Sequence, residues 1–144
     1  MASPSIAATL IMIELHEIGA GENCQNAQVR ARVLESPKAR YTKQFAVRES
    51  GSEVAFLALD LIPETDYLVL YEIFVPSELR RRGIGSRLLG EVESLAKSLG
   101  YESVALFPSL LDSEYPESKL IAWYRSHGYV PRPDCPTELE KLVV

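Results

Sequence analysis

The chain has 144 residues, of which 15 are Lys or Arg and 20 are Asp or Glu, giving a formal net charge of -5. This length is enough to bury a hydrophobic core in one domain. We therefore expect a single domain over residues 1–144, with residues 1–6 disordered. The acidic balance argues against a general nucleic-acid binder, because phosphate backbones select basic surfaces, and we expect no nucleic-acid partner.

The N-terminal stretch MASPSIAATLIMIELHE has an apolar run, Ile6–Ile13, that is followed at once by Glu14. It lacks the basic start and cleavage site of a secretory signal. It is also shorter than the roughly 20 apolar residues of a membrane span. We expect a cytoplasmic protein with no membrane partner.

Cysteine and histidine are too sparse to form a metal site. The two cysteines, Cys24 and Cys135, lie far apart in the sequence, and the two histidines, His16 and His127, are also isolated. This spacing fits neither a disulfide framework nor a zinc ligand set. We expect two reduced thiols and no bound metal.

Hydrophobic periodicity and turn residues predict the elements in chain order. They are a strand near 10–18, a helix entered from the loop at 19, strands at 44–50, 53–62 and 67–75, a helix at 84–99, a strand at 101–107, a helix at about 117–127, and two short strands at 128–133 and 137–144. The polar stretch SPKARYTKQ, residues 36–44, is compatible with a short helix or a loop.

This order of elements predicts an α/β (α+β) fold with a mixed central β-sheet flanked by helices on both faces. The segment 67–75, YLVLYEIFV, is nearly continuous in apolar residues, as is typical of a central strand that is covered on both faces. The strand–helix–strand unit that begins there should be a right-handed crossover between parallel strands.

The stretch ELRRRGIGSRLL, residues 78–89, places four arginines around Gly-Ile-Gly at the start of a predicted helix. Free N–H groups and the helix dipole make such a turn suitable for phosphate. Solvated arginines on a glycine turn are the alternative. The turn is not a P-loop, because no lysine follows the glycines, and Leu88 breaks the dinucleotide fingerprint.

The run RRRGIG resembles the R/Q-x-x-G-x-G/A signature of the GCN5-related N-acetyltransferase (GNAT) family, which uses acetyl-CoA. The whole block EIFVPSELRRRGIGSRLL is similar to the strand, loop and helix around that signature. About 40 residues later, LIAWYRSHGYV is similar to the second conserved helix of the family, with Tyr124, Gly128 and Tyr129 at the matching places. The resemblance extends over Tyr67–Val130.

The resemblance implies an N-acetyltransferase that moves an acetyl group from acetyl-CoA to a primary amine of a small molecule or peptide. A non-catalytic acyl-CoA-binding module of the same fold is one alternative, and a phosphate-binding domain for another nucleotide is a second. The family often pairs through its edge or C-terminal strands, so a homodimer is left open. The implied cofactor-binding residues are Ile73, Phe74 and Val75 along the pantetheine arm, and Arg80, Arg81, Arg82, Gly83, Ile84, Gly85 and Ser86 at the pyrophosphate.

Two residues are predicted to be catalytic. Tyr124 falls at the position of the general-acid tyrosine of the family, and a phenol with an ordinary pKa of about 10 can protonate a departing thiolate. A core aromatic is the alternative. Glu72 is the single charge within its strand, so we expect it to face a cleft, water or a basic partner. It is our candidate for a general base acting through water, with ordered water alone or a structural salt bridge as alternatives; Glu53 and Asp60 are further candidates.

One departure from the family pattern concerns the second conserved helix. Glu117 stands where many members have an Asn that contacts the cofactor, and Ser118 is a candidate cap for the helix. The preceding loop, 108–118, is longer than is typical of the family. Its Asp112, Glu114 and Tyr115 are candidates for shaping the acceptor pocket.

Overall fold

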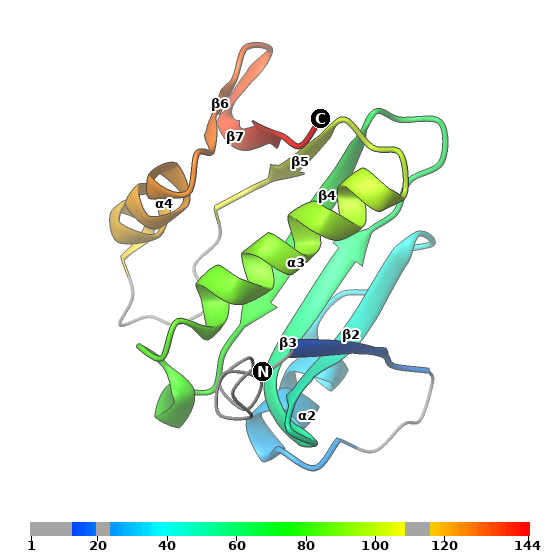
Figure 1. Ribbon diagram of the computed structural model, residues 1–144, viewed down its shortest axis with the longest axis vertical. Coiled ribbons are helices and arrows are strands. Elements are labelled where there is room, and N and C mark those ends of the chain that lie inside the picture. The colour runs from blue at the N-terminus through cyan, green and yellow to red at the C-terminus, as the bar shows by residue number, and fades with distance from the viewer. Residues whose placement is uncertain (1–12, 20–23, 109–115) are drawn as a thin grey trace, which may run out of the picture.

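The computed structural model describes residues 13–19, 24–108 and 116–144 (Figure 1). The expected disorder of residues 1–6 and the candidate pocket residues of the loop at 112–115 lie outside this range. The elements, in chain order, are β1 (Ile13–Glu17), α2 (Ala27–Glu35), β2 (Thr42–Glu49), β3 (Ser52–Asp60), β4 (Tyr67–Phe74), the 3₁₀ turn η1 (Ser77–Leu79), α3 (Ile84–Ser98), β5 (Ser103–Leu106), α4 (Glu117–Ser126), β6 (Val130–Arg132) and β7 (Cys135–Leu142).

All described strands join one mixed sheet in the order β1-β2-β3-β4-β5-β7-β6. β4 and β5 are parallel, and every other neighbouring pair is antiparallel. The predicted mixed sheet is thus confirmed, and α3 is the crossover that joins its two parallel strands. Because β4 lies in the middle of this order, its nearly continuous apolar run is placed between two neighbouring strands.

Helices cover both faces of the sheet (Figure 1). The apolar stripe of α3 buries Ile84, Leu88, Leu89, Val92 and Ala96 in the larger core cluster. On the other face, α2 buries Val29 in a smaller cluster with residues of β2 and β3. The 3.6-residue spacing that predicts α3 therefore also fixes which of its sides meets the sheet.

The stretch 36–44 does not form a helix. α2 ends at Glu35, and β2 already begins at Thr42. Pro37 ends α2, because the residue before a proline is disfavoured in the helical region and Pro has no N–H to donate. β2 begins at Thr42, so only residues 38–41 remain, which is too few for a further α-helix. The loop alternative is therefore correct, and the helix alternative is wrong.

The described helices include none that is long and apolar enough to cross a membrane.

Candidate active site

The central strand β4 contains a β-bulge at Tyr71. β3 and β4 pair Ala58 with Glu72 and Leu59 with Leu70, which leaves Tyr71 as the extra residue on β4. A bulge re-aims the side chains around it. Tyr71 is 40% exposed, although both of its chain neighbours are buried. The sheet thus presents one aromatic side chain outward while it keeps the adjacent carboxylate inside.

β4 and β5 separate at the bulge. Their parallel pairing stops at Leu70 and Leu106, where β5 ends, whereas β4 continues to Phe74. Within the described residues, the last part of β4 therefore has no strand partner on its β5 side. That edge keeps backbone N–H and C=O groups for a ligand. Ile73 and Phe74 lie in this open segment, and Val75 follows it directly.

A small pocket, open to solvent, lies where the two strands part. Its lining comes from β4, from the end of β5 and from α4: Leu70, Tyr71, Glu72, Ile73, Phe107, Leu120 and Tyr124. Both predicted catalytic residues thus line one pocket, although 52 positions separate them in the sequence.

Tyr124 contributes a buried phenol to this pocket. Its ring meets the rings of Trp123 and Tyr129 edge-on, at centroid distances of 4.9 and 5.8 Å. Burial raises the pKa of Tyr124 well above its ordinary value, because a phenolate there would be poorly solvated. Its hydroxyl donates no hydrogen bond to any residue that the structure describes. The site thus holds a neutral donor that is available to a ligand.

Glu72 is held by two residues of the α2 segment. Its Oε2 accepts from Arg32 Nε at 2.6 Å, and its Oε1 accepts from Arg32 Nη2 and Ser36 Oγ, both at 3.0 Å. The Glu72 side chain is 3% exposed. Its hydrogen bond to Arg32 raises the pKa of that guanidinium above the ordinary value. Of the environments expected for Glu72, the structure provides the basic partner, which stabilises a buried carboxylate.

The two further base candidates are also held by hydrogen bonds. Glu53 accepts from the backbone N–H of Asn26 at 2.7 Å, and Asp60 accepts from the Thr42 hydroxyl at 2.6 Å. Neither lines the pocket between β4 and β5. They are therefore placed less well for proton transfer there than Glu72.

The segment Arg80–Gly85, here called the glycine turn, has a left-handed backbone at two positions. Arg81 has φ = 66°, and Gly83, the N-cap of α3, has φ = 75°. Glycine adopts this region without strain, whereas arginine does so at a cost. Arg81 therefore adopts a strained backbone conformation that glycine would adopt without this cost.

The first turn of α3 offers free backbone donors. The first helical hydrogen bond is donated by Arg87 N–H to the Gly83 carbonyl. The N–H groups of Ile84, Gly85 and Ser86 therefore have no acceptor within the helix. A Cβ at Gly85 would lie 3.3 Å from Trp123 Cζ2. Gly85 thus lets α4 pack closely against the turn that carries the free donors.

The arginines around the turn fall into two groups. Arg80 Nε donates to the Val75 carbonyl at 2.9 Å, and Arg87 pairs with Glu49 at 2.6 Å. These two side chains brace the turn against the strands beside it. Arg81 and Arg82 are exposed, and they supply positive potential to the surface of the turn.

The start of α4 differs from the sequence expectation. The N-cap is Pro116, and no side chain caps the helix; Glu117 and Ser118 are its first two residues. The proposal that Ser118 caps α4 is therefore wrong, because this residue already lies within the helix. Glu117 remains at the first turn, where its negative charge is favourable to the helix dipole.

Sequence reasoning missed Arg32, Ser36 and the bulge residue Tyr71. Arg32 is 40 positions from its partner, and no local pattern links the two. A bulge also leaves no mark in a strand that is apolar almost throughout. The sequence offers one signal, which is the single charged residue, Glu72, within an apolar strand. A buried carboxylate requires a partner somewhere in the chain.

Comparison with known proteins identifies the family. Residues 41–131 match the acetyltransferase (GNAT) domain, and this match spans more than half of the chain. No curated protein is significantly similar in sequence. The matched region runs from β2 to β6 and includes the bulge, the glycine turn and Tyr124.

Three solved structures illustrate the likeness of fold. One is a GNAT family acetyltransferase from Elizabethkingia anophelis with acetyl-CoA bound, with TM-score 0.64, 14% identity, and coverage of 90% of this chain and 97% of that chain. Another is the ribosomal-protein-S18-alanine N-acetyltransferase of Escherichia coli, with TM-score 0.61, 16% identity, and coverage of 92% and 94%. The third is the KacTA–DNA complex, with TM-score 0.62, 12% identity, and coverage of 92% and 94%. The predicted α/β fold is thus confirmed, and the chain belongs to the GNAT acetyltransferase family.

Proposed function

We propose that this protein transfers an acetyl group from acetyl-CoA to a primary amine of a small molecule or peptide. The observation that carries the proposal is the separation of β4 and β5 beside the buried hydroxyl of Tyr124. It provides an open strand edge, a pocket and a proton donor at one place. Family membership and the acetyl-CoA bound to one structural relative support the choice of cofactor.

The cofactor would lie across three parts of the site. The free N–H groups at the start of α3 and the surrounding arginines, Arg80–Arg82, would bind its pyrophosphate. The pantetheine arm would run along the open edge of β4, where Ile73, Phe74 and Val75 offer backbone groups. This path brings the thioester to the pocket that Tyr124 lines.

Acetyl transfer requires two proton movements. The neutral acceptor amine attacks the thioester carbonyl, and its nitrogen gives up a proton as a tetrahedral oxyanion forms, which backbone N–H groups of β4 can stabilise. The oxyanion then collapses, the C–S bond breaks, and the thiolate leaves. Tyr124 donates its phenolic proton to that thiolate, and solvent restores the proton afterwards.

Glu72 would receive the amine proton through a water molecule. The three hydrogen bonds from Arg32 and Ser36 occupy three of about four acceptor positions on its carboxylate. One position on Oε2 is left for water in the pocket that Glu72 lines. Ordered water acting without Glu72 is the alternative. In either case, Arg32 fixes the carboxylate and keeps it from moving toward the substrate.

A non-catalytic acyl-CoA-binding module is the second candidate. The observation that favours it is Glu117 at the first turn of α4, where the resemblance leads us to expect an Asn that contacts the cofactor. Such a module would bind acetyl-CoA without turnover. The absence of a nucleic-acid partner also stays a prediction, because one structural relative was solved in a complex with DNA.

The proposed function is tested by amine-dependent release of free thiol from acetyl-CoA. A panel of primary amines should include polyamines, amino acids, aminoglycosides and peptides with a free N-terminus. Thiol release that requires both an amine and the protein supports the acetyltransferase. Tight binding of acetyl-CoA with no release across the panel supports the binding module instead.

A further inference from the structure

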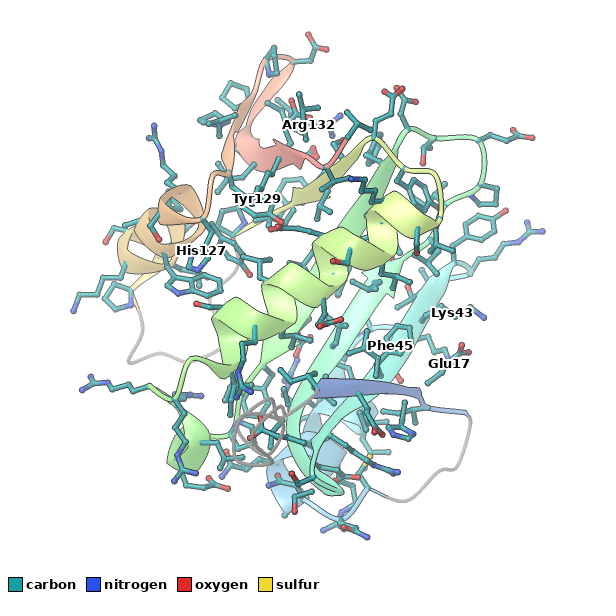
Figure 2. The ribbon with its side chains drawn as sticks, in the orientation of Figure 1. Glu17, Lys43, Phe45, His127, Tyr129 and Arg132 are labelled. Carbon is teal, nitrogen blue, oxygen red and sulfur yellow. The ribbon has the colours of Figure 1, made fainter. Side chains whose placement is uncertain are left out.

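The end of α4 contacts the first turn of α3 through a pair of polar side chains. Ser86 Oγ lies 2.9 Å from His127 Nε2. Figure 2 shows His127 at the end of α4, on the side of this helix that faces α3. Ser86 carries one of the free N–H groups of the glycine turn, so this contact lies within one residue of the proposed pyrophosphate site.

The other side of the imidazole fixes where its proton lies. His127 Nδ1 is 2.8 Å from the Trp123 carbonyl oxygen, which can only accept a hydrogen bond. Ser126 Oγ also lies 3.2 Å from Nδ1, but its hydroxyl donates to the Trp123 carbonyl at 2.6 Å. With both neighbours placed in this way, Nδ1 carries the proton of a neutral imidazole, and Nε2 is left as an acceptor. In this state, the Ser86 hydroxyl donates its single proton to Nε2.

This arrangement conflicts with phosphate binding. Phosphate oxygens accept hydrogen bonds, and Ser86 has only one proton to donate. While that proton points at His127, Ser86 Oγ has no proton to donate to a phosphate oxygen. The conflict disappears if Nε2 gains a proton, because Nε2–H then donates to Ser86 Oγ and releases the hydroxyl proton.

We propose that His127 takes up a proton from solvent when the cofactor pyrophosphate binds, so that Ser86 can donate to a phosphate oxygen. The inference rests on the proposed function, because it requires the pyrophosphate to lie at this turn. His127 is then a positioning residue that acts through Ser86. The bound phosphate stabilises the imidazolium, and the imidazolium in turn strengthens binding.

The charged groups on the neighbouring elements are consistent with this coupling. Arg87 on α3 pairs with Glu49, and Lys141 on β7, which lies beside Gly128, pairs with Glu93. Arg125, two positions before His127 on α4, is exposed. No carboxylate bonds His127 within the part of the chain that the structure describes. The anion that would favour the imidazolium therefore arrives with the ligand.

The test is calorimetric titration of dephospho-coenzyme A in two buffers of different ionisation enthalpy, at about pH 7. This ligand keeps the pyrophosphate but lacks the phosphomonoester, which itself titrates near pH 6. The dependence of the observed heat on the buffer gives the number of protons taken up per bound ligand. His16→Gln is the matched control, since His16 lies on β1 beside Glu14.

We expect the unchanged protein and His16→Gln to take up a fraction of a proton, and their Kd to rise with pH by at most tenfold per pH unit. The Kd of His127→Gln for dephospho-coenzyme A should lie within about threefold of the value for the unchanged protein at neutral pH. The glutamine NH2 group can donate a hydrogen bond to Ser86 without first taking up a proton from solvent. Its proton uptake and its pH dependence should vanish. His127→Phe, which keeps a ring beside Trp123 but lacks the donor, should bind more weakly at low pH.

Binding without proton uptake in the unchanged protein would overturn the inference and leave the proposed function intact. Uptake that persists in His127→Gln would also overturn it, because another group would then be the acceptor. If the unchanged protein binds neither coenzyme A nor dephospho-coenzyme A, the proposed function is wrong, and the inference that rests on it is wrong as well.

Discussion

Arg32 donates two hydrogen bonds to the Glu72 carboxylate, from Nε at 2.6 Å and from Nη2 at 3.0 Å, although 40 positions separate the two residues in the sequence. The pair ties α2 to the strand segment directly after the bulge. It therefore couples the helix on one face of the sheet to the pocket in which the chemistry is proposed. The same carboxylate can serve the fold and the reaction, and substitutions must separate these roles.

Replacing Glu72 with Gln should destabilise the protein by roughly 2–4 kcal/mol, because it leaves the partly buried Arg32 charge with only the exposed Glu35 as a charged partner. Arg32→Gln should cost a similar amount, and the double variant should cost less than the sum of both. Denaturant unfolding measures all three. Glu35→Gln is the control: Glu35 pairs with Arg32 in a 67% exposed position, and its loss should cost under about 0.5 kcal/mol. Additive costs for the two single variants would contradict this coupling.

Tyr124→Phe should lower kcat by about 10²-fold or more while the Kd for acetyl-CoA changes little, because only the proton donor is lost. Stopped-flow or steady-state thiol release and calorimetry measure the two quantities. Tyr129→Phe is the matched control, since the Tyr129 hydroxyl donates to Glu93 at 3.0 Å, away from the pocket lining. That variant should lose about 1–2 kcal/mol of stability and keep its kcat. Normal turnover by Tyr124→Phe would show that this phenol is not the acid.

The pH dependence of kcat provides a separate check on Tyr124. An acid must be protonated to act, so loss of its proton would appear as a fall in kcat above its pKa. Burial raises the pKa of Tyr124 above its ordinary value of about 10. We therefore expect no fall in kcat up to about pH 10. A fall below about pH 9 that disappears in Tyr124→Phe would contradict the protonated state assigned here.

Gly85→Ala should weaken acetyl-CoA binding by about threefold, because the new methyl group would lie 3.3 Å from the Trp123 ring, which must shift by a few tenths of an ångström. Gly90→Ala is the matched control on the same helix. Its Cβ would meet nothing within 4 Å, so it should raise the free energy of unfolding by up to about 1 kcal/mol. Calorimetry and thermal unfolding measure both effects. Equal affinity in the two variants would show that this packing does not shape the phosphate site.

The sequence predicts the elements well where one periodicity dominates. α3 follows from its spacing of Ile84, Leu88, Leu89 and Val92, and β4 follows from its nearly continuous apolar run. Residues 36–44 left two alternatives open, because a polar stretch has no hydrophobic period to decide between them. The position of Pro37 was the missing argument.

The site is less predictable than the fold because its parts are distant in sequence. The signature RRRGIG and the position of Tyr124 identify the cofactor turn and the candidate acid through resemblance. The partners Arg32 with Glu72 and Ser86 with His127 appear only when α2 meets β4 and α4 meets α3. No local pattern encodes such pairs, since the tertiary packing of helices on the sheet creates them.

The central claim is that the glycine turn and the open edge of β4 bind acetyl-CoA. It is tested most directly by thermal unfolding with acetyl-CoA, with ATP as the control. A ligand at about 100 times its Kd adds roughly 2.7 kcal/mol of stability. For a domain of this size, that should raise the midpoint by about 5–10 °C. The account predicts such a rise with acetyl-CoA and none with ATP. No rise with acetyl-CoA, or an equal rise with both ligands, would contradict it.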